Sequence, residues 1–175
     1  MEKGLIHIYC GDGKGKTTAS LGLAVRAAGR GFKVLILQFL KSQDTGEIPT
    51  LEKIPEITVL RSNKVFGFTF QMTDQEKEEC RAVHDELLEQ GIRMAQSGQT
   101  DLLILDEIIS TCNYNLVNGD NLINFLKNKP ATMEVVLTGR NPSEELLEIA
   151  DYVSEIKKVK HPYDRGIKAR IGIER

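Results

Sequence analysis

The sequence predicts an α/β protein built on a doubly wound, mostly parallel sheet of about five to six strands flanked by helices. Short apolar runs typical of buried strands alternate along the chain with segments whose spacing or small residues are typical of helices. Each connection between successive apolar runs is long enough for the right-handed crossover that parallel strands need. Because 175 residues suffice for one well-buried core but not for two, residues 1–175 are expected to form a single domain.

The first expected unit consists of a strand, a loop and a helix. Residues 5–10 (LIHIYC) form an apolar run that ends at glycines, and a segment rich in small residues follows and ends at Gly31. Small side chains would let this helix lie close against the sheet. Residues 33–39 (KVLILQF) predict a strand buried on both faces, and residues 57–61 (ITVLR) predict a further strand.

The segments around these strands are less regular. Residues 41–55 contain two prolines and a glycine and are expected to form a loop. Residues 62–72 (SNKVFGFTFQM) place three phenylalanines close together without a clear period, so no element is assigned to them. Thr73 and Glu76 match a capping box and predict the start of a long amphipathic helix, which Gly98 ends.

The second half of the chain continues the alternation. Residues 101–107 (DLLILDE) predict a buried strand that ends in two acids, and residues 132–140 (TMEVVLTGR) predict another strand. The other expected elements are a short helix at 122–127, a helix with Asn141 as N-cap, Pro142 in its first turn and Glu144 as box residue that runs to Ala150, a last central strand at 152–159, and an edge strand or tail at 170–174.

Composition and charge exclude several classes of protein. A net charge of −2 argues against a general nucleic-acid binder. No apolar run reaches the roughly 18 residues that a membrane helix needs, and Met1 lies almost directly before the first strand, which leaves no room for a signal peptide. The three cysteines, Cys10, Cys80 and Cys112, lack CxxC spacing and indicate neither disulfides nor zinc. We therefore expect a cytoplasmic protein without nucleic-acid or membrane partners.

Residues 9–20 (YCGDGKGKTTAS) nearly match the Walker A phosphate-binding loop. The pattern expects a glycine where the chain has Cys10, which is expected to pack at the strand end instead. In such a loop backbone N–H groups surround a phosphate at a helix start, Lys16 adds a positive charge, and Thr17 offers a hydroxyl to Mg²⁺. The alternative is a chance glycine-rich turn, but the flanking strand and helix favour a P-loop NTPase fold of the RecA-like type. The expected nucleotide-binding residues are Gly11, Asp12, Gly13, Lys14, Gly15, Lys16, Thr17 and Thr18.

Two acids end the strand at 101–107. Asp106 and Glu107 are expected to lie beside the phosphate loop, because their strand should neighbour the first one, and from there they can reach a metal directly or through water. The alternative is a solvated strand end or helix start, which acidic residues also suit. Because hydrolysing P-loop enzymes also keep a carboxylate here, the pair does not separate hydrolysis from group transfer.

Four stretches together resemble a known family. With the loop, the chain carries LLILDEI, LTGR and ADYVSEIKKVKHPYDRGIKARIGIE, in the order found in the P-loop ATP:corrinoid adenosyltransferases (the cob(I)yrinic acid a,c-diamide or cob(I)alamin adenosyltransferases). The likeness runs from Ile6 to Glu174. It implies that ATP lies reversed in the loop and that a Co(I) corrinoid (cobalamin, cobinamide or cobyrinic acid a,c-diamide) attacks its 5′ carbon. The whole triphosphate then leaves, and the reaction serves adenosylcobalamin biosynthesis or salvage.

The resemblance also implies roles for single residues. Lys16, Thr17 and Glu107 are expected to be catalytic, with Mg²⁺ (or Mn²⁺) held by Thr17 and Glu107 and with Asp106 in a supporting position behind the ligands. A Co(I) nucleophile carries no proton, so no general base is required. This agrees with a chain whose only histidines are His7, His84 and His161.

The corrinoid side is expected to involve aromatic residues. By resemblance, Phe68 and Phe70 press on the lower face of the corrin and ease the reduction of Co(II); the alternative is plain core packing. His161, within KHPYD, either contacts corrinoid or nucleotide or belongs to a solvated turn. Arg140 either contacts phosphate or ends its strand. The family further implies a homodimer and a flavoprotein reductant.

The start of the chain differs from the family pattern, and two other kinds of function were considered. Better-known family members carry an N-terminal extension that covers the corrinoid, whereas this chain starts at the first strand, so another loop or a partner subunit is expected to cover the substrate, or it is held more openly. The alternative functions are a P-loop kinase or ATPase acting on another small substrate, and a non-catalytic nucleotide- or corrinoid-binding regulator.

Overall fold

A computed structural model describes residues 2–41, 45–62, 64, 66, 67 and 69–174, and of Phe70 only the backbone. Within these residues the chain forms a six-stranded sheet in the order β3-β2-β4-β5-β1-β6. All neighbouring strands run parallel. The predicted fold class, a parallel α/β sheet flanked by helices, is confirmed. The expected pairing of the strand of Asp106 with the first strand was wrong, because β5 lies between β1 and β4. The strands are β1 (Ile6–Cys10), β2 (Val34–Gln38), β3 (Ile57–Arg61), β4 (Leu102–Asp106), β5 (Glu134–Thr138) and β6 (Tyr152–Glu155).

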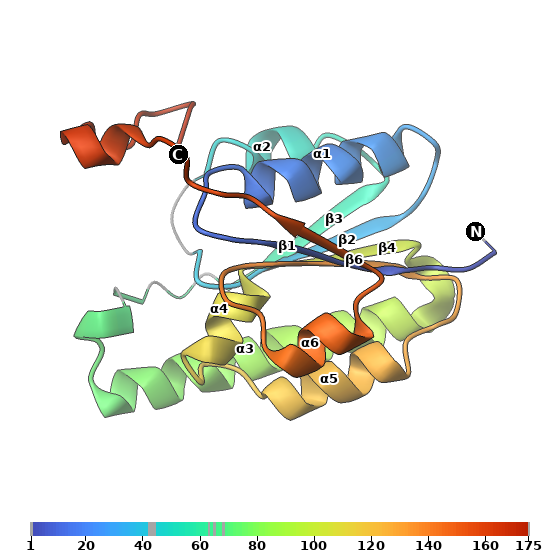
Figure 1. Ribbon diagram of the computed structural model, residues 1–175. Helices are drawn as coiled ribbons and strands as arrows, with labels where there is room; N and C mark the ends of the chain where they lie inside the picture. The colour runs from blue at the N-terminus through green and yellow to red at the C-terminus, as the bar shows by residue number, and fades with distance from the viewer. Residues whose placement is uncertain (1, 42–44, 63, 65, 68, 175) are drawn as a thin grey trace.

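Helices cover both faces of the sheet (Figure 1). One face carries α1 (Lys16–Ala28) and α2 (Ile48–Leu51), and the other carries α3 (Asp74–Met94), α4 (Ile108–Asn113), α5 (Gly119–Lys127) and α6 (Glu144–Ile149). Each layer has its own apolar core against the sheet. Short helical turns complete the description: η1 (Thr69–Gln71), η2 (Ala95–Gln99) and η3 (Pro162–Arg165). Among the described residues, no helix has both the length and the apolar character to cross a membrane.

The core follows from the sequence pattern. Every residue of β2 and of β4 is buried, as their apolar runs predict for strands covered on both faces. The expected small-residue packing of α1 is present, because Ala24 is fully buried against the sheet. The capping box of α3 is formed as predicted: the Thr73 hydroxyl accepts a hydrogen bond from the Glu76 backbone N–H, and the Glu76 carboxylate accepts one from the Thr73 N–H.

Some expected boundaries were wrong. The expected central strand at 152–159 is the short edge strand β6, which pairs only with β1 and has all four residues exposed. The segment at 170–174 forms turns and no strand. Helix α6 is capped by Ser143, whose side chain accepts from the Leu146 N–H, because Asn141 adopts a left-handed conformation and cannot start the helix. The expected loop at 41–55 contains α2, which two buried apolar side chains hold against the sheet.

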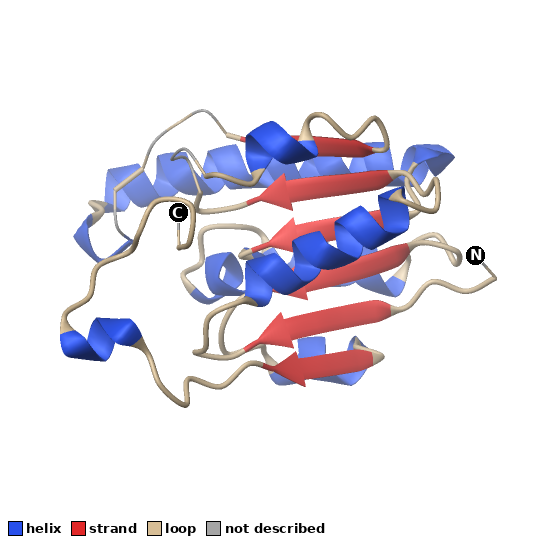
Figure 2. Cartoon of the chain, turned by 90° about the horizontal axis from the view of Figure 1, so that it is seen from above, coloured by secondary structure: helices blue, strands red, loops and turns tan. Residues whose placement is uncertain are grey.

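The carboxyl ends of the parallel strands meet at one edge of the sheet. All strands point the same way, and the segment after β6 runs back along this edge (Figure 2). In an open parallel sheet this edge is where ligands bind. The register pairs Gln38 on β2 with Asp106 on β4, so the polar ends of two buried strands lie side by side.

Candidate active site

Residues 11–15 form a tight loop between β1 and α1. Gly11 and Gly15 have φ angles of 109° and 118°, in the left-handed region that glycine tolerates best. Cys10 is buried, as expected for a packing residue at the strand end. A Cβ atom built on Gly11 would lie 2.4 Å from the carbonyl oxygen of Ile156, so the segment after β6 packs directly against the loop. At Gly11 a side chain is therefore excluded by both conformation and space, and at Gly15 conformation alone disfavours one.

The segment after β6 also takes up polar groups of the loop. The Gly13 N–H donates to the Ile156 carbonyl at 2.8 Å, although the sequence suggested that the loop N–H groups would face a phosphate. The Asp12 carboxylate accepts from the Lys158 N–H at 2.9 Å, and this hydrogen bond lowers the pKa of Asp12. Gly11, Asp12 and Gly13 thus anchor the C-terminal segment to the loop.

Lys16 is folded over the loop. Its side chain is buried, and Nζ donates to the Gly13 carbonyl at 2.9 Å. Burial lowers the pKa of Lys16, while the negative charge of Glu107 opposes that effect. The ammonium group is therefore held at the phosphate side of the loop by a backbone contact within the loop itself.

Thr17 is joined to the end of β4. Its hydroxyl donates to Asp106 Oδ1 at 2.9 Å, and the Thr138 hydroxyl at the end of β5 donates to the same oxygen at 2.8 Å. Asp106 is fully buried. A third donor is Lys41, whose Nζ lies 2.6 Å from Asp106 Oδ2 and 2.8 Å from Thr17 Oγ1. Neither Lys41 nor Thr138 was expected in the site: Lys41 belongs to no motif, and in the LTGR stretch only Arg140 was considered.

Glu107 occupies a different position from Asp106. It has a φ angle of 63°, unusual for a residue with a side chain, and its N–H donates to the Thr138 hydroxyl at 2.8 Å. Its side chain lines the cavity beside the loop, and no hydrogen bond to its carboxylate occurs among the described residues. Asp106 is thus the acid that contacts Thr17, as a supporting carboxylate would, and Glu107 is the acid that faces the cavity.

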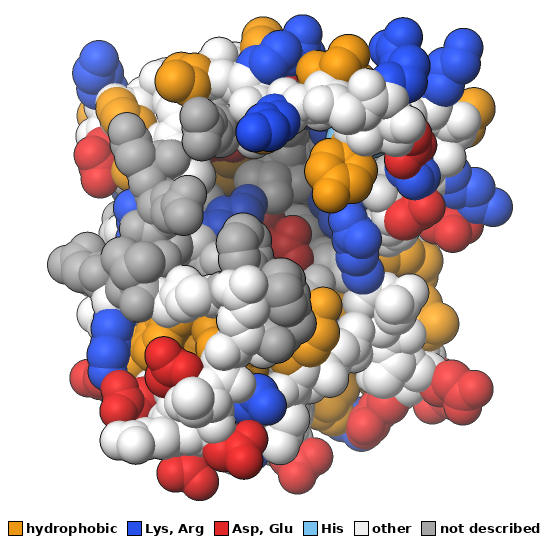
Figure 3. All heavy atoms as spheres, turned by 90° about the vertical axis from the view of Figure 1, so that its left-hand side faces the viewer, with side chains coloured by type: hydrophobic (Ala, Val, Ile, Leu, Met, Phe, Trp, Pro, Cys, Tyr) orange, Lys and Arg blue, Asp and Glu red, His pale blue; other side chains and the backbone are white. Residues whose placement is uncertain are grey.

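The loop opens into a cavity of about 660 Å³ at the carboxyl edge of the sheet. Figure 3 shows this side of the molecule, where basic and acidic side chains meet in a hollow. The cavity brings together the predicted residues Asp12 to Thr18, Glu107, Arg140 and His161, and it adds Lys41, Glu47 and residues 172–174. Lys14, on its rim, pairs with Glu174 of the C-terminal segment at 3.2 Å. The volume of the cavity falls within the range usual for small-molecule sites.

The predicted corrinoid residues are placed only in part. His161 lines the cavity beside the phosphate loop, and its Nδ1 accepts from the Tyr163 N–H at 3.1 Å. Phe68 lies outside the described residues, and so does the side chain of Phe70, whose backbone belongs to η1. The remaining phenylalanine of this segment, Phe66, packs near His84 with ring centroids 6.4 Å apart.

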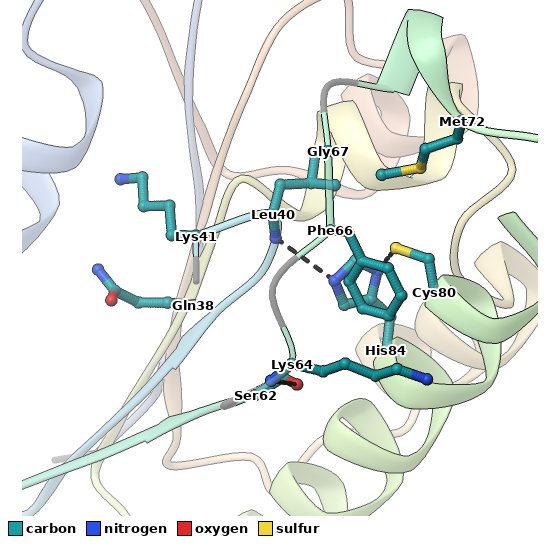
Figure 4. A pocket seen from close by; sticks show the side chains of 10 residues that line it. All are labelled: Gln38, Leu40, Lys41, Ser62, Lys64, Phe66, Gly67, Met72, Cys80 and His84. Carbon is teal, nitrogen blue, oxygen red and sulfur yellow. Dashed lines mark hydrogen bonds between the residues drawn. The ribbon is translucent and has the colours of Figure 1, made fainter. Parts of the chain in front are cut away.

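A small pocket lies beside β2, at the turn that precedes Lys41. His84 is buried and accepts from the Leu40 N–H through Nε2 at 3.4 Å, while its Nδ1 donates to the Leu116 carbonyl at 3.1 Å. Leu40 adopts a φ angle of 56°, so the chain turns sharply after the strand. Figure 4 shows the result: Gln38 and Lys41 extend to one side of the strand end, and His84 and Cys80 lie on the other.

Metal-binding potential at the site is limited to a few protein groups. Among the described residues no cluster of three or more His, Cys, Asp or Glu side chains exists that could hold a metal ion by itself. One hydroxyl and one or two carboxylates, completed by phosphate oxygens and water, are the usual surroundings of Mg²⁺ in nucleotide enzymes. The arrangement around Thr17 therefore suits a metal that is bound together with a nucleotide.

The fold and the site define a class of protein. A glycine loop between strand and helix, a buried lysine, and a threonine bonded to a strand-end aspartate are the parts of a P-loop nucleotide-binding site. The fold is also similar to a solved structure titled "The cytoplasmic domain of EssC", with a TM-score of 0.56 and 16% identity, over 98% of this chain and 37% of that one. At that identity the likeness concerns the fold alone.

The family is narrower than that class. The chain belongs to the family "ATP:corrinoid adenosyltransferase BtuR/CobO/CobP", whose model matches residues 2–175. It is 37% identical to the corrinoid adenosyltransferase of Escherichia coli K12, over 99% of this chain and 86% of that protein. It is 36% identical to corrinoid adenosyltransferase CobA of Salmonella typhimurium, with the same coverage, and 31% identical to that of Pseudomonas aeruginosa, over 99% and 84%. Membership identifies the chain as an enzyme that transfers an adenosyl group to a corrinoid.

Proposed function

We propose that this enzyme binds ATP with its triphosphate in the loop and its 5′ carbon facing outward, toward the cobalt of a Co(I) corrinoid. The corrinoid is cobalamin, cobinamide or cobyrinic acid a,c-diamide, and the reaction serves adenosylcobalamin biosynthesis or salvage. The observation that carries the proposal is the cavity beside the loop, whose lining includes Lys14, Lys16, Lys41 and Arg140. So many cations suit a leaving group that departs with its full charge.

The bond changes require no proton transfer. The cobalt lone pair forms the Co–C bond, the C5′–O bond breaks, and its electron pair leaves with the triphosphate, so that Co(I) becomes Co(III). The histidines agree with this scheme. His84 has both ring nitrogens engaged in hydrogen bonds, and His7 pairs with Glu134 on the strands β1 and β5. Neither forms part of the cavity wall.

The residues of the loop orient and stabilise the triphosphate. Lys16 would leave the Gly13 carbonyl for the phosphates, and the positive N-terminal end of α1 favours the same anion. Thr17 and Glu107 would hold Mg²⁺ or Mn²⁺, with Asp106 behind Thr17. The fit is supported by the ammonium of Lys41, which already lies between Thr17 and Asp106 as a cation. The metal would supply positive charge to the departing triphosphate.

The corrinoid contacts extend the proposal beyond the nucleotide. His161 lines the cavity and is proposed to contact the corrinoid from the segment after β6. Phe68 and Phe70 are proposed to press on the corrin face, by resemblance to the family. A homodimer, a flavoprotein reductant and a cytoplasmic location are proposed on the same ground.

The proposed reaction is tested by measuring its two products. Wild-type protein incubated with ATP, Mg²⁺ and chemically reduced cobalamin under anaerobic conditions should form a light-sensitive alkylcobalamin, measured by absorbance before and after illumination. Inorganic triphosphate should appear in equal amount, measured by ion chromatography. ADP and phosphate without a cobalt–carbon product would contradict the proposal and favour a kinase or ATPase.

A further inference from the structure

We propose that Lys41 is a built-in cation of the metal site: its ammonium occupies the place of the divalent ion until the ion arrives with the nucleotide and displaces it. The inference rests on the proposed role of Thr17 as a metal ligand. It adds a positioning residue that lies outside the phosphate-loop motif, at the end of the neighbouring strand β2.

The hydrogen bonds of Thr17 make Lys41 and a metal ion competitors. Its hydroxyl proton points to Asp106 Oδ1 at 2.9 Å, which leaves the oxygen lone pairs for another partner. Lys41 Nζ donates to this oxygen at 2.8 Å. A metal ligated by Thr17 would use the lone pair that now accepts the ammonium proton. Lys41 and the metal ion therefore compete for one atom.

Lys41 also supplies the positive charge beside the buried carboxylate of Asp106. Asp106 is fully buried, and its other donors are neutral: the hydroxyls of Thr17 and Thr138, and the Gln38 amide at 3.5 Å. The carboxylate of a buried aspartate needs a positive partner, because its desolvation costs several kcal/mol that neutral donors offset only in part. Lys41 meets this need with a contact of 2.6 Å to Asp106 Oδ2. Lys16 does not substitute for it, because its ammonium is bound to Gly13.

The side chain of Lys41 is free to turn away from Asp106, although its backbone is not. Its backbone position is fixed by the turn at Leu40, which His84 holds through the Leu40 N–H. Its side chain, in contrast, is 25% exposed and lines the cavity where the phosphates would lie. A long lysine side chain at such a place can turn from Asp106 to a phosphate oxygen without movement of the backbone. The displaced charge would then contribute to triphosphate binding.

A consequence is an order of binding. Without nucleotide, a divalent ion must break two hydrogen bonds of Lys41 and gains few protein ligands in return, so free metal should bind weakly. With ATP, phosphate oxygens complete the coordination of the ion and also receive the released ammonium. The metal should therefore enter with the nucleotide and not before it.

The experiment measures Mn²⁺ binding without nucleotide, by the electron paramagnetic resonance signal of free Mn²⁺. Lys41→Met removes the ammonium and keeps the length of the side chain. The matched control is Lys127→Met on α5, which breaks an ammonium–carboxylate contact of 2.7 Å with Glu145 far from the loop. Lys41→Met should bind Mn²⁺ at least about tenfold more tightly than the wild type, because the competing ion pair is gone. The control should bind as the wild type does.

Equal or weaker Mn²⁺ binding by Lys41→Met would overturn the inference. If the variant loses its folded circular dichroism spectrum without metal, millimolar Mg²⁺ should restore that spectrum; failure to restore it would also count against the inference. The proposed reaction is judged separately, on wild-type protein, by formation of alkylcobalamin and triphosphate. A wild type that forms both, with a Lys41→Met variant that gains no Mn²⁺ affinity, leaves the reaction standing and removes only the role of Lys41.

Discussion

Lys16 shows how a single residue is prepared for an anion before the anion is bound. Its side chain is buried, its ammonium donates, among the residues that the structure describes, only to the Gly13 carbonyl, and burial lowers its pKa. A phosphate that replaces this carbonyl would restore a full ionic partner to a partly desolvated charge. Such preorganised groups stabilise a departing anion more than mobile surface lysines do.

Replacement Lys16→Ala should therefore lower the rate of triphosphate release by about 10²–10³-fold. The rate is measured with saturating ATP and chemically reduced cobalamin. The thermal unfolding midpoint serves as a control for the fold and should change little compared with the rate. A variant that keeps the wild-type rate would place the reacting end of ATP away from the loop.

His84, which holds the turn after β2, should make the free energy of unfolding depend on pH. It is buried and neutral, and burial lowers its pKa from the usual 6.5. Above about pH 6.5 neither state binds the proton, whereas at lower pH the unfolded chain takes up a proton that the folded protein resists. The free energy of unfolding should thus decline as the pH falls through this value.

His84→Gln removes this titration while it keeps an acceptor for the Leu40 N–H. Denaturant unfolding between pH 7.5 and pH 5 should show a smaller decline of stability for the variant than for the wild type, by up to about 1 kcal/mol per pH unit. Parallel pH curves for the two proteins would mean that His84 does not titrate in this way.

At the scale of elements, the helix α3 packs against β2 through Gly91, which leaves no room for a side chain. A Cβ atom on Gly91 would lie 2.2 Å from Cδ2 of Leu37, a fully buried side chain. On the other face, a Cβ on Gly22 of α1 meets nothing within 4 Å. The two glycines therefore have different reasons to be present, although both lie in helices that pack on the sheet.

Gly91→Ala should lower the free energy of unfolding by about 1–3 kcal/mol, because an added methyl group overpacks the core. Gly22→Ala is the matched control and should raise it by about 0.5–1 kcal/mol, through the higher helix propensity of alanine. Both values come from urea denaturation. A Gly91→Ala variant as stable as the wild type would show that α3 can move away from the sheet without cost.

The sequence predicts local features of this molecule better than contacts between distant segments. The buried strand β4, the capping box at Thr73 and the phosphate loop are each encoded within about ten residues, and all were found where the patterns place them. The short length of β6 was missed, because an edge strand ends where its single neighbour stops pairing. The apolar pattern of residues 152–159 carries no information about that partner.

The candidate site was likewise predicted in its local parts and missed in its long-range contacts. Sequence patterns identified the loop, Asp106 at the end of β4 and Glu107 directly after it, but not the roles of Lys41 and Thr138 or the contact of Gly13 with Ile156. These groups join the site through strand register and through pairs more than a hundred residues apart, such as Asp12 with the Lys158 N–H, which are separated by 146 positions. One signal was present: Lys41 directly follows the end of a buried strand, and a cation is the natural partner of a buried acid. The strand of Asp106 was expected beside β1, however, whereas its neighbours are β2 and β5.

At the scale of the whole molecule, the residues proposed to bind the triphosphate and the metal lie together at the carboxyl ends of the strands. The loop after β1, the acids at the end of β4, Thr138 at the end of β5, Lys41 after β2 and the segment after β6 all meet there. None of the described residues that line this cavity lies at the amino ends of the strands. The direction in which ATP lies across this edge decides whether carbon or phosphorus is the atom attacked.

A crystal structure of the protein with ATP and Mg²⁺ measures that direction. The account predicts the terminal phosphate deepest in the loop, within hydrogen-bonding distance of the Lys16 ammonium, and the 5′ carbon turned toward the open side of the cavity near His161. An α-phosphate buried in the loop with the terminal phosphate directed to the open side would contradict it.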